Sequence, residues 1–196
     1  MENEEKILNP QESLRIIRET IDVAKKGVQE NGFHFLLWGW LVALASVGEY
    51  YLRQVRGGTD PYLIWAVMPL IGVPAALIYE WRRDKKHHER NLVREWYGLV
   101  WLGFAISLIL SLVLAIRNQV SPVPLVMTLA AFATFMSGLL MRFRPLVLGA
   151  AVLWIGAAVC LALPMGVHVL VQAGGIVLGY LVPGYMLNQK ARQHHV

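Results

Sequence analysis

The sequence predicts an all-α, polytopic membrane protein with six transmembrane helices in three hairpins, preceded by a cytosolic amphipathic helix. Of the 196 residues, 56% are hydrophobic and 16% are charged, whereas a soluble domain carries about 25% charged residues. The apolar residues form six blocks of about 20 residues, the helix length that crosses the hydrocarbon layer of a bilayer. Charged residues gather in 1–30, in 82–95 and at the C-terminus, so the hydrophobic blocks are nearly free of them.

The six predicted spans are joined by short connections that contain glycine, proline or arginine. Gly57 and Gly58 mark the first turn, and the tripeptide 164–166 marks the last. Residues 1–32 and 188–196 are predicted to be cytosolic. The transmembrane domain is predicted over 33–187, with spans at 33–52, 61–80, 96–116, 122–141, 145–163 and 167–187.

The distribution of lysine and arginine predicts the orientation. An even number of spans places both termini on one side. If that side is the cytosol, fifteen of the 18 basic residues lie in cytosolic segments and three lie in outer turns. Cytosolic loops of membrane proteins carry such an excess of basic residues. This bias accounts for the net charge of +5 without nucleic-acid binding, which we do not expect.

The N-terminal segment 10–30 is predicted to form an amphipathic helix. Asn9 can cap it, and Pro10 suits its first position. Such a helix can dock on its own bundle, lie on lipid, or pair with another protein or a second copy. Apolar residues at alternating spacings of three and four form its candidate partner seam: Leu14, Ile17, Ile21, Ala24 and Val28.

Two alternatives stay open for Glu49, near the outer end of the first span. Arg53 follows four residues later, so an interfacial ion pair is the simpler interpretation. The other interpretation is a contact for a cation or substrate at an outer mouth.

Prolines and glycines interrupt the second and sixth spans. A proline within a helix frees the carbonyl four residues earlier; for Pro183 this is the carbonyl of Gly179. Interrupted helices commonly build binding sites in membrane proteins, although packing can also fill a kink. Trp154 is predicted at mid-bilayer, facing protein. The candidate cavity-lining residues are Pro69, Gly72, Pro74, Trp154, Gly175, Gly179 and Pro183.

Small residues predict where helices approach one another. Ala130, Thr134 and Gly138 are one turn apart in the fourth span, and Gly175 and Gly179 form a GxxxG step in the sixth. Close approach of backbones drives helix association in lipid, so both faces are predicted to pack.

The basic segment 82–94 and the turn at 142–144 are predicted to lie against the inner leaflet. Lysine and arginine near anionic headgroups contribute about 1 kcal/mol each. The candidate lipid-contact residues are Arg82, Arg83, Lys85, Lys86, Arg142 and Arg144. His87, His88 and Glu89 offer metal ligands, but consecutive histidines on a polar loop are usually solvated. We expect no metal, no cofactor and no catalytic residues.

Three stretches resemble a set of small bacterial membrane proteins: ESLRIIRETIDVAKKGVQENGFHFLLWGWLVALASVGEY, LLMRFRPLVLGAAVLW and GYLVPGYMLNQK. In these proteins a polar N-terminal helix runs into an F-L-x-W-G span. An R/K-F-K/R-P-L turn opens the fifth span, and Y-L-x-P-G-Y closes the last. The resemblance implies a six-span layout and a bacterial inner-membrane location. It implies no activity, because the family carries no established catalytic residues.

The sequence is compatible with three functions. The first is a non-enzymatic scaffold or regulatory or assembly partner that works through its cytosolic segments. The second is a small uncoupled transporter, channel or lipid-binding protein that uses the interrupted second and sixth spans. The third, an enzyme acting on lipid at the cytosolic face, would need a nucleophile or base among Glu80, His87, His88 and Glu89. We expect the first function.

Overall fold

The structure is a computed structural model, and it describes residues 32–56, 63–84 and 92–193. These residues form helices and turns with no strand. The predicted N-terminal helix with its partner seam, and Lys85 and Lys86, lie outside the described residues.

Six helical segments are long and apolar enough to cross a membrane, which confirms the predicted fold class. Each lies within three residues of its predicted boundaries at both ends. The first five are α2 (Gly32–Arg56), α3 (Leu63–Asp84), α4 (Leu92–Arg117), α5 (Val123–Leu140) and α6 (Arg144–Leu161). The sixth is composite: η1 (Met165–Val167), α7 (His168–Ile176), the π-helical η2 (Val177–Leu181) and α8 (Val182–Gln193).

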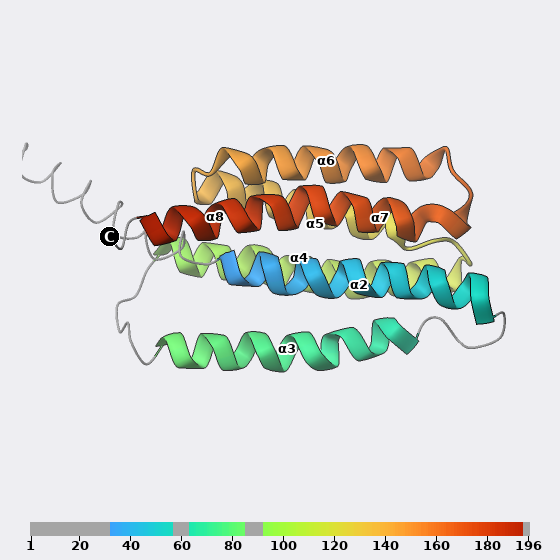
Figure 1. The fold of residues 1–196 in the computed structure, drawn as a ribbon, viewed down its shortest axis with the longest axis horizontal. Coiled ribbons are helices and arrows are strands. Elements are labelled where there is room, and N and C mark those ends of the chain that lie inside the picture. The colour runs from blue at the N-terminus through green and yellow to red at the C-terminus, as the bar shows by residue number, and fades with distance from the viewer. Residues whose placement is uncertain (1–31, 57–62, 85–91, 194–196) are drawn as a thin grey trace, which may run out of the picture.

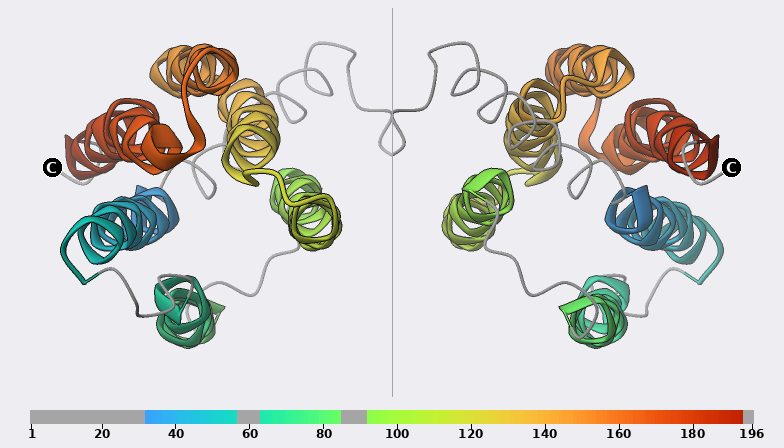
Figure 2. Two further views of the ribbon diagram at one scale, coloured as in Figure 1. Left: turned by 90° about the vertical axis from the view of Figure 1, so that its right-hand side faces the viewer. Right: turned by 90° about the vertical axis from the view of Figure 1, so that its left-hand side faces the viewer.

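The helices run side by side in an open arc, seen end-on in Figure 2. Around the arc the order is α3, α2, the α7–α8 segment, α6, α5 and α4. The predicted hairpin partners are therefore neighbours. The arc also joins the first span to the last, because α2 packs along α7, η2 and α8. The helices α3 and α4 form its two ends (Figures 1 and 2).

The core lies among α5, α6 and the last span. The predicted packing face of α5 is confirmed, since Ala130, Thr134 and Gly138 are all buried. A Cβ atom on Gly138 would lie 3.0 Å from the backbone nitrogen of Val147 in α6. Small residues thus bring these two backbones together, as the sequence predicts.

The last span accommodates Pro183 with a π-helical turn. The N–H of Val182 donates to the carbonyl of Val177, five residues earlier. The carbonyl of Gly179 lies against Gly149 of α6. A Cβ on Gly149 would be 2.3 Å from that oxygen. Two glycines therefore let the interrupted helix pack tightly, and Pro183 itself is fully buried.

Helix α3 contacts the bundle mainly through α2. Gly72 sits against the ring of Trp38 at mid-helix. Near the start of α2, His34 Nε2 lies 2.8 Å from Glu80 Oε1, and Phe33 stacks on Tyr79 with 4.0 Å between ring centroids. Polar and aromatic contacts near its ends thus supplement the limited apolar packing of α3.

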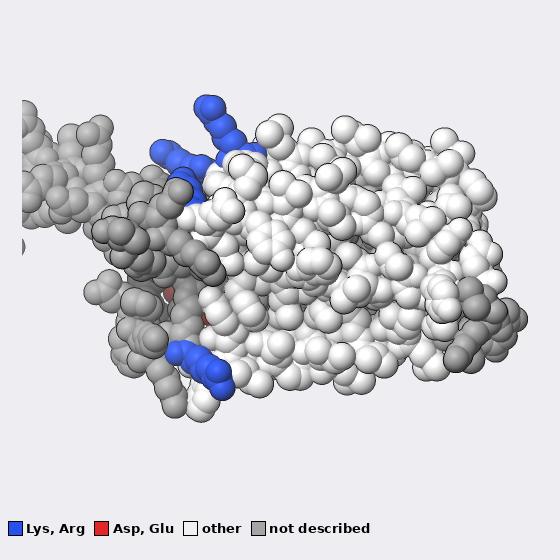
Figure 3. Space-filling view, in the orientation of Figure 1, with Lys and Arg blue, Asp and Glu red and all other residues white. Residues whose placement is uncertain are grey.

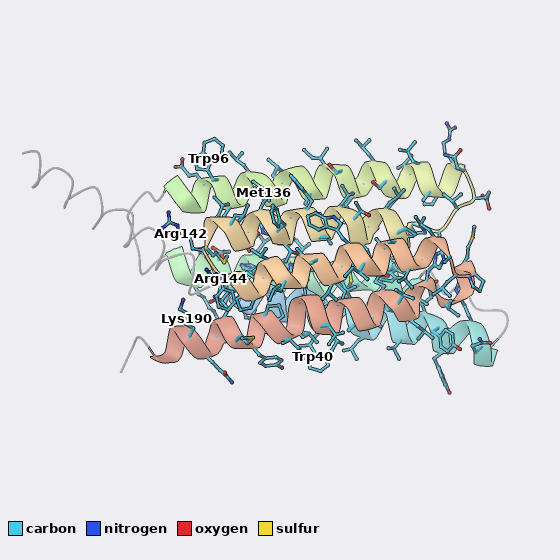
Figure 4. All side chains as sticks on the ribbon, turned by 90° about the horizontal axis from the view of Figure 1, so that it is seen from above. Trp40, Trp96, Met136, Arg142, Arg144 and Lys190 are labelled. Carbon is cyan, nitrogen blue, oxygen red and sulfur yellow. The ribbon has the colours of Figure 1, made fainter. Side chains whose placement is uncertain are left out.

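Basic side chains gather at one end of the bundle (Figure 3). We call this the cationic end; Arg142, Arg144 and Lys190 lie there in Figure 4. The opposite end, where α2 ends and α7 begins, is the distal end. It carries Arg53 and Arg117. Along the described chain, the charge asymmetry expected from the sequence is therefore present in three dimensions.

Candidate functional site

Glu49 is a buried carboxylate near the distal end of α2. It is 4% exposed. The predicted ion pair with Arg53 is confirmed: Arg53 Nη2 lies 2.6 Å from Glu49 Oε1, and Arg53 Nε donates to the same oxygen at 2.8 Å. Trp65 Nε1 of α3 donates to the other oxygen, Oε2, at 2.5 Å. Charge-assisted hydrogen bonds of this kind offset the cost of removing a carboxylate from water.

Trp65 is a partner that sequence reasoning missed. Its contact with Glu49 depends on how the α2–α3 hairpin folds back, and helical spacing does not show that. Because α3 is held mainly by α2, this bond is one of its few polar attachments.

Two polar side chains on α7 are buried at the same end of the bundle. His168 and Gln172 are 6% and 2% exposed. His168 Nε2 lies 2.9 Å from the carbonyl oxygen of Leu163. A carbonyl accepts only, so Nε2 is the donor in this contact. Within the described part of the chain, neither His168 Nδ1 nor Gln172 Oε1 has a hydrogen-bond partner.

Helix α2 packs antiparallel on the last span, with Gly32 against Gly184 and Gly39 against Leu181. Glu49 and Gln172 both lie further towards the distal end, ten residues after Gly39 in α2 and nine residues before Leu181 in the last span. Helices α2 and α7 lie side by side in Figures 1 and 2.

Both side chains lie on the faces that point into the bundle. On α2, Phe35, Gly39, Ser46 and Glu49 form one buried stripe. On the last span, Gln172 shares a buried stripe with Gly175, which faces Met127 and Leu153 of the neighbouring helices. We call the polar side chains near this end of the bundle the distal polar cluster: Glu49, Arg53, Trp65, His168 and Gln172.

The predicted cavity residues do not come together. Gly72 packs against α2, Pro69 is half-buried and Pro74 is exposed. In Figure 2, α2 stands between α3 and α8, so the second and sixth spans lie on opposite sides of it.

The cavity residues of the sixth span are engaged in packing. Gly175 lies against Met127, and Gly179 against Leu153 and Gly149. Pro183 is buried.

Trp154 was expected to face protein, and it does so in part, since it is 37% exposed. Its ring lies 5.6 Å from that of Phe135, between ring centroids. The fully buried face of α6 carries Leu146, Gly149, Ala150, Leu153, Ala157 and Cys160, so the indole lies beside that face.

The candidate lipid-contact residues with described side chains are Arg82, Arg142 and Arg144. All three are exposed at the cationic end. Lys190 joins them in Figure 4 and stands 5.7 Å from the ring centroid of Phe143. Sequence reasoning did not select Lys190, because the turn after α5 and the last helix meet only in the fold.

Titratable groups in the described ranges do not gather into a metal site. No group of three or more His, Cys, Asp or Glu side chains there is close enough to share an ion.

The fold defines a multi-pass helical membrane protein. Comparison with known proteins adds nothing more specific: no family model, no curated protein and no solved structure matches the chain.

Proposed function

We propose that this protein is a non-enzymatic partner in the membrane, a scaffold or assembly or regulatory subunit, that binds an apolar transmembrane helix of another protein. The observation that carries the proposal is the open arc. Only 6% of the most apolar stretch of α3 and of α4 is buried, against 33–44% in the other spans. These two helices end the arc and contribute little to its core.

The composition of α4 supports this function. Helix α4 is the most apolar of the six spans. Exposed aliphatic side chains cover it, among them Leu102, Ile106 and Ile109. A helix with so little packing inside its own bundle has a large surface free for lateral contact, and close packing drives helix association in lipid.

A photocrosslinking experiment in living cells tests the proposal. A benzophenone amino acid replaces Ile109 of α4 in one variant and Ile155 of α6 in the control. The two isoleucines are similarly exposed, 62% and 64%, each within a span. We expect one discrete protein adduct from position 109 and none from 155. The adduct should also form from the reciprocal position on the identified partner. Adducts with lipid alone at both positions would refute the proposal.

The predicted N-terminal seam gives a second test. Replacing Ile17 and Ile21 with Asp puts charge on the seam predicted from the sequence, while Arg18→Asp changes its polar face. If this helix recruits a cytosolic partner, only the seam variant loses it in a pull-down. An unchanged set of partners would argue against a recruiting role for this helix.

We propose the bacterial inner membrane as the location, with both termini cytosolic. The basic residues at the cationic end support this orientation, because such residues resist translocation. A cysteine placed at position 88 should resist a membrane-impermeant thiol reagent in intact cells and react after lysis. Labelling in intact cells would reverse the orientation.

A second candidate function is binding of a small solute or lipid, as a carrier, channel or receptor. The interrupted spans two and six support it less well, because α2 separates α3 from α8. The distal polar cluster supports it better, since polar residues inside spans commonly mark ligand or ion sites.

A further inference from the structure

We propose that the cationic end binds one anionic phospholipid with two phosphates in its headgroup, at the place where the start of α6 meets α8. The inference is independent of the partner function, which uses α3 and α4 at the two ends of the arc. It rests on three basic side chains that the fold brings around one ring: Arg142 and Arg144 of the turn before α6, and Lys190 of α8.

The ring of Phe143 is the point at which these cations meet. Arg142 and Arg144 flank Phe143 in the chain, and both of their side chains are exposed. Phe143 itself is 7% exposed. Lys190 Nζ lies 5.7 Å from the centroid of its ring. Two segments that are far apart in the sequence therefore present three cations around one buried ring, at the same end of the bundle in Figure 4.

These three charges have no acidic partner within the described part of the chain. No carboxylate there contacts Arg142, Arg144 or Lys190. Like charges held side by side repel one another, so an anion placed among them would be attracted by all three. Arginine binds planar oxyanions through paired N–H donors, and lysine binds them as a point charge. An oxyanion is therefore the ligand that these donors fit.

The depth of the cations along the bundle identifies the source of the oxyanion. The apolar stretch of the fifth span begins at Arg144, and that of the sixth ends at Lys190. Residues that close an apolar span stand where the hydrocarbon layer gives way to the headgroups. The oxyanions at that depth are the phosphates of lipids.

Apolar side chains continue from the cations into the membrane. Leu148 lies one turn after Arg144 in α6 and is 67% exposed, and Met186 lies one turn before Lys190 in α8 and is 46% exposed. Helix α6 is in contact with the last span along this stretch. A phospholipid can thus place its phosphates at the cations while its acyl chains pack on both helices. A soluble oxyanion would use the cations alone.

The number of cations indicates the headgroup. A phosphodiester carries one negative charge, which would leave two of the three positive charges unbalanced. A headgroup with two phosphodiesters carries two. Basic sites between transmembrane helices bind headgroups of this kind. Cardiolipin belongs to this class of lipid and serves as the probe.

The test uses the full-length protein in neutral detergent micelles, with bound lipid counted by native mass spectrometry. The probes are tetraoleoyl cardiolipin, dioleoyl phosphatidylglycerol with one phosphate, and dioleoyl phosphatidylcholine, which has a phosphate but no net charge. We expect saturable binding of one cardiolipin. Phosphatidylglycerol should bind about fivefold more weakly, the factor that one charge contributes at such a surface. Neither phosphatidylcholine nor inorganic phosphate should displace cardiolipin.

Four substitutions locate the site. Lys190→Gln and Arg144→Gln each remove one cation and should weaken cardiolipin binding about fivefold. Lys190→Arg keeps the charge and should bind as the wild type does. Arg82→Gln is the matched control, because Arg82 is an exposed cation at the same end of the bundle but lies on α3, beyond α2. Its loss should leave the affinity within about twofold, since a distant exposed charge is screened. Circular dichroism checks that each variant is folded.

Four results would overturn the inference. The first is equal affinity for cardiolipin and phosphatidylcholine. The second is unchanged affinity in folded Lys190→Gln or Arg144→Gln. The third is an equally large loss in Arg82→Gln, which would show attraction to the overall charge of this end without a site. The fourth is displacement of cardiolipin by an equal concentration of inorganic phosphate, which would make the ligand a soluble anion. Equal affinity for cardiolipin and phosphatidylglycerol would refute the requirement for two phosphates.

Discussion

Gly149→Ala is expected to destabilise the protein strongly, because α6 and the last span touch at backbone distance there. The new Cβ would lie 2.3 Å from the carbonyl oxygen of Gly179. A carbon and a carbonyl oxygen in contact normally stand about 3.3 Å apart, so the helices must separate by about 1 Å. The nearest atoms belong to backbone, which cannot rotate away as a flexible side chain can.

The size of the effect follows from overpacking. Inserting a methyl group into a filled core costs about 1–3 kcal/mol. Separation of the helices also weakens the contact of Gly179 with Leu153. We therefore expect a loss of about 2–3 kcal/mol in the free energy of unfolding. Denaturation of the reconstituted protein by increasing mole fractions of dodecyl sulfate, followed by circular dichroism, measures it.

Gly174→Ala is the matched control. Gly174 lies in α7, and a Cβ there meets nothing within 4 Å. Alanine also has the higher helix propensity, so this variant should be as stable as the wild type or slightly more stable. If Gly149→Ala and Gly174→Ala unfold at the same denaturant fraction, the close approach of α6 to the last span is wrong.

Three further predictions concern polar contacts and a strained turn. Glu49→Ala removes the acceptor of Trp65 and should lower the free energy of unfolding by about 2 kcal/mol, with Glu49→Gln intermediate; equal losses for both variants in dodecyl sulfate titrations would contradict this. His34→Ala breaks the contact with Glu80 and should cost about 1 kcal/mol. A double-mutant cycle with Glu80→Ala should give a coupling free energy of similar size, whereas full additivity would show no coupling. Arg142 has φ 49°, so Arg142→Gly should raise the thermal unfolding midpoint by relieving about 1 kcal/mol of backbone strain; a lowered midpoint would show that the side chain matters more.

The number and limits of the spans were predictable from the sequence, because hydrocarbon thickness fixes helix length whatever the tertiary packing. The Glu49–Arg53 pair was predictable for a similar reason, since positions four apart meet on any helix. Small residues also predicted the packing faces on α5 and the last span. Each of these inferences depends on local geometry.

The remainder of the site depends on which helices become neighbours. Neither the packing of α2 against α7 nor the return of Trp65 to Glu49 has a local signal. Gln172 did offer one, as an amide within an apolar span, and sequence reasoning did not use it. The interrupted spans predicted a cavity near the middle of the membrane. In the structure, a π-helical turn and two facing glycines accommodate Pro183 there.

Because α2 packs against the last span, its packing surface is completed only at the end of biosynthesis. The ribosome delivers α2 first and α7 and α8 last. At about 5–20 residues per second, the first helix waits on the order of ten seconds for the surface that covers Phe35 and Gly39. During that interval, the only partners available to Glu49 are those in its own hairpin, α2 and α3. An insertase or another factor that binds this early hairpin would therefore determine the yield of folded protein. Truncation after α6 should leave the chain prone to degradation.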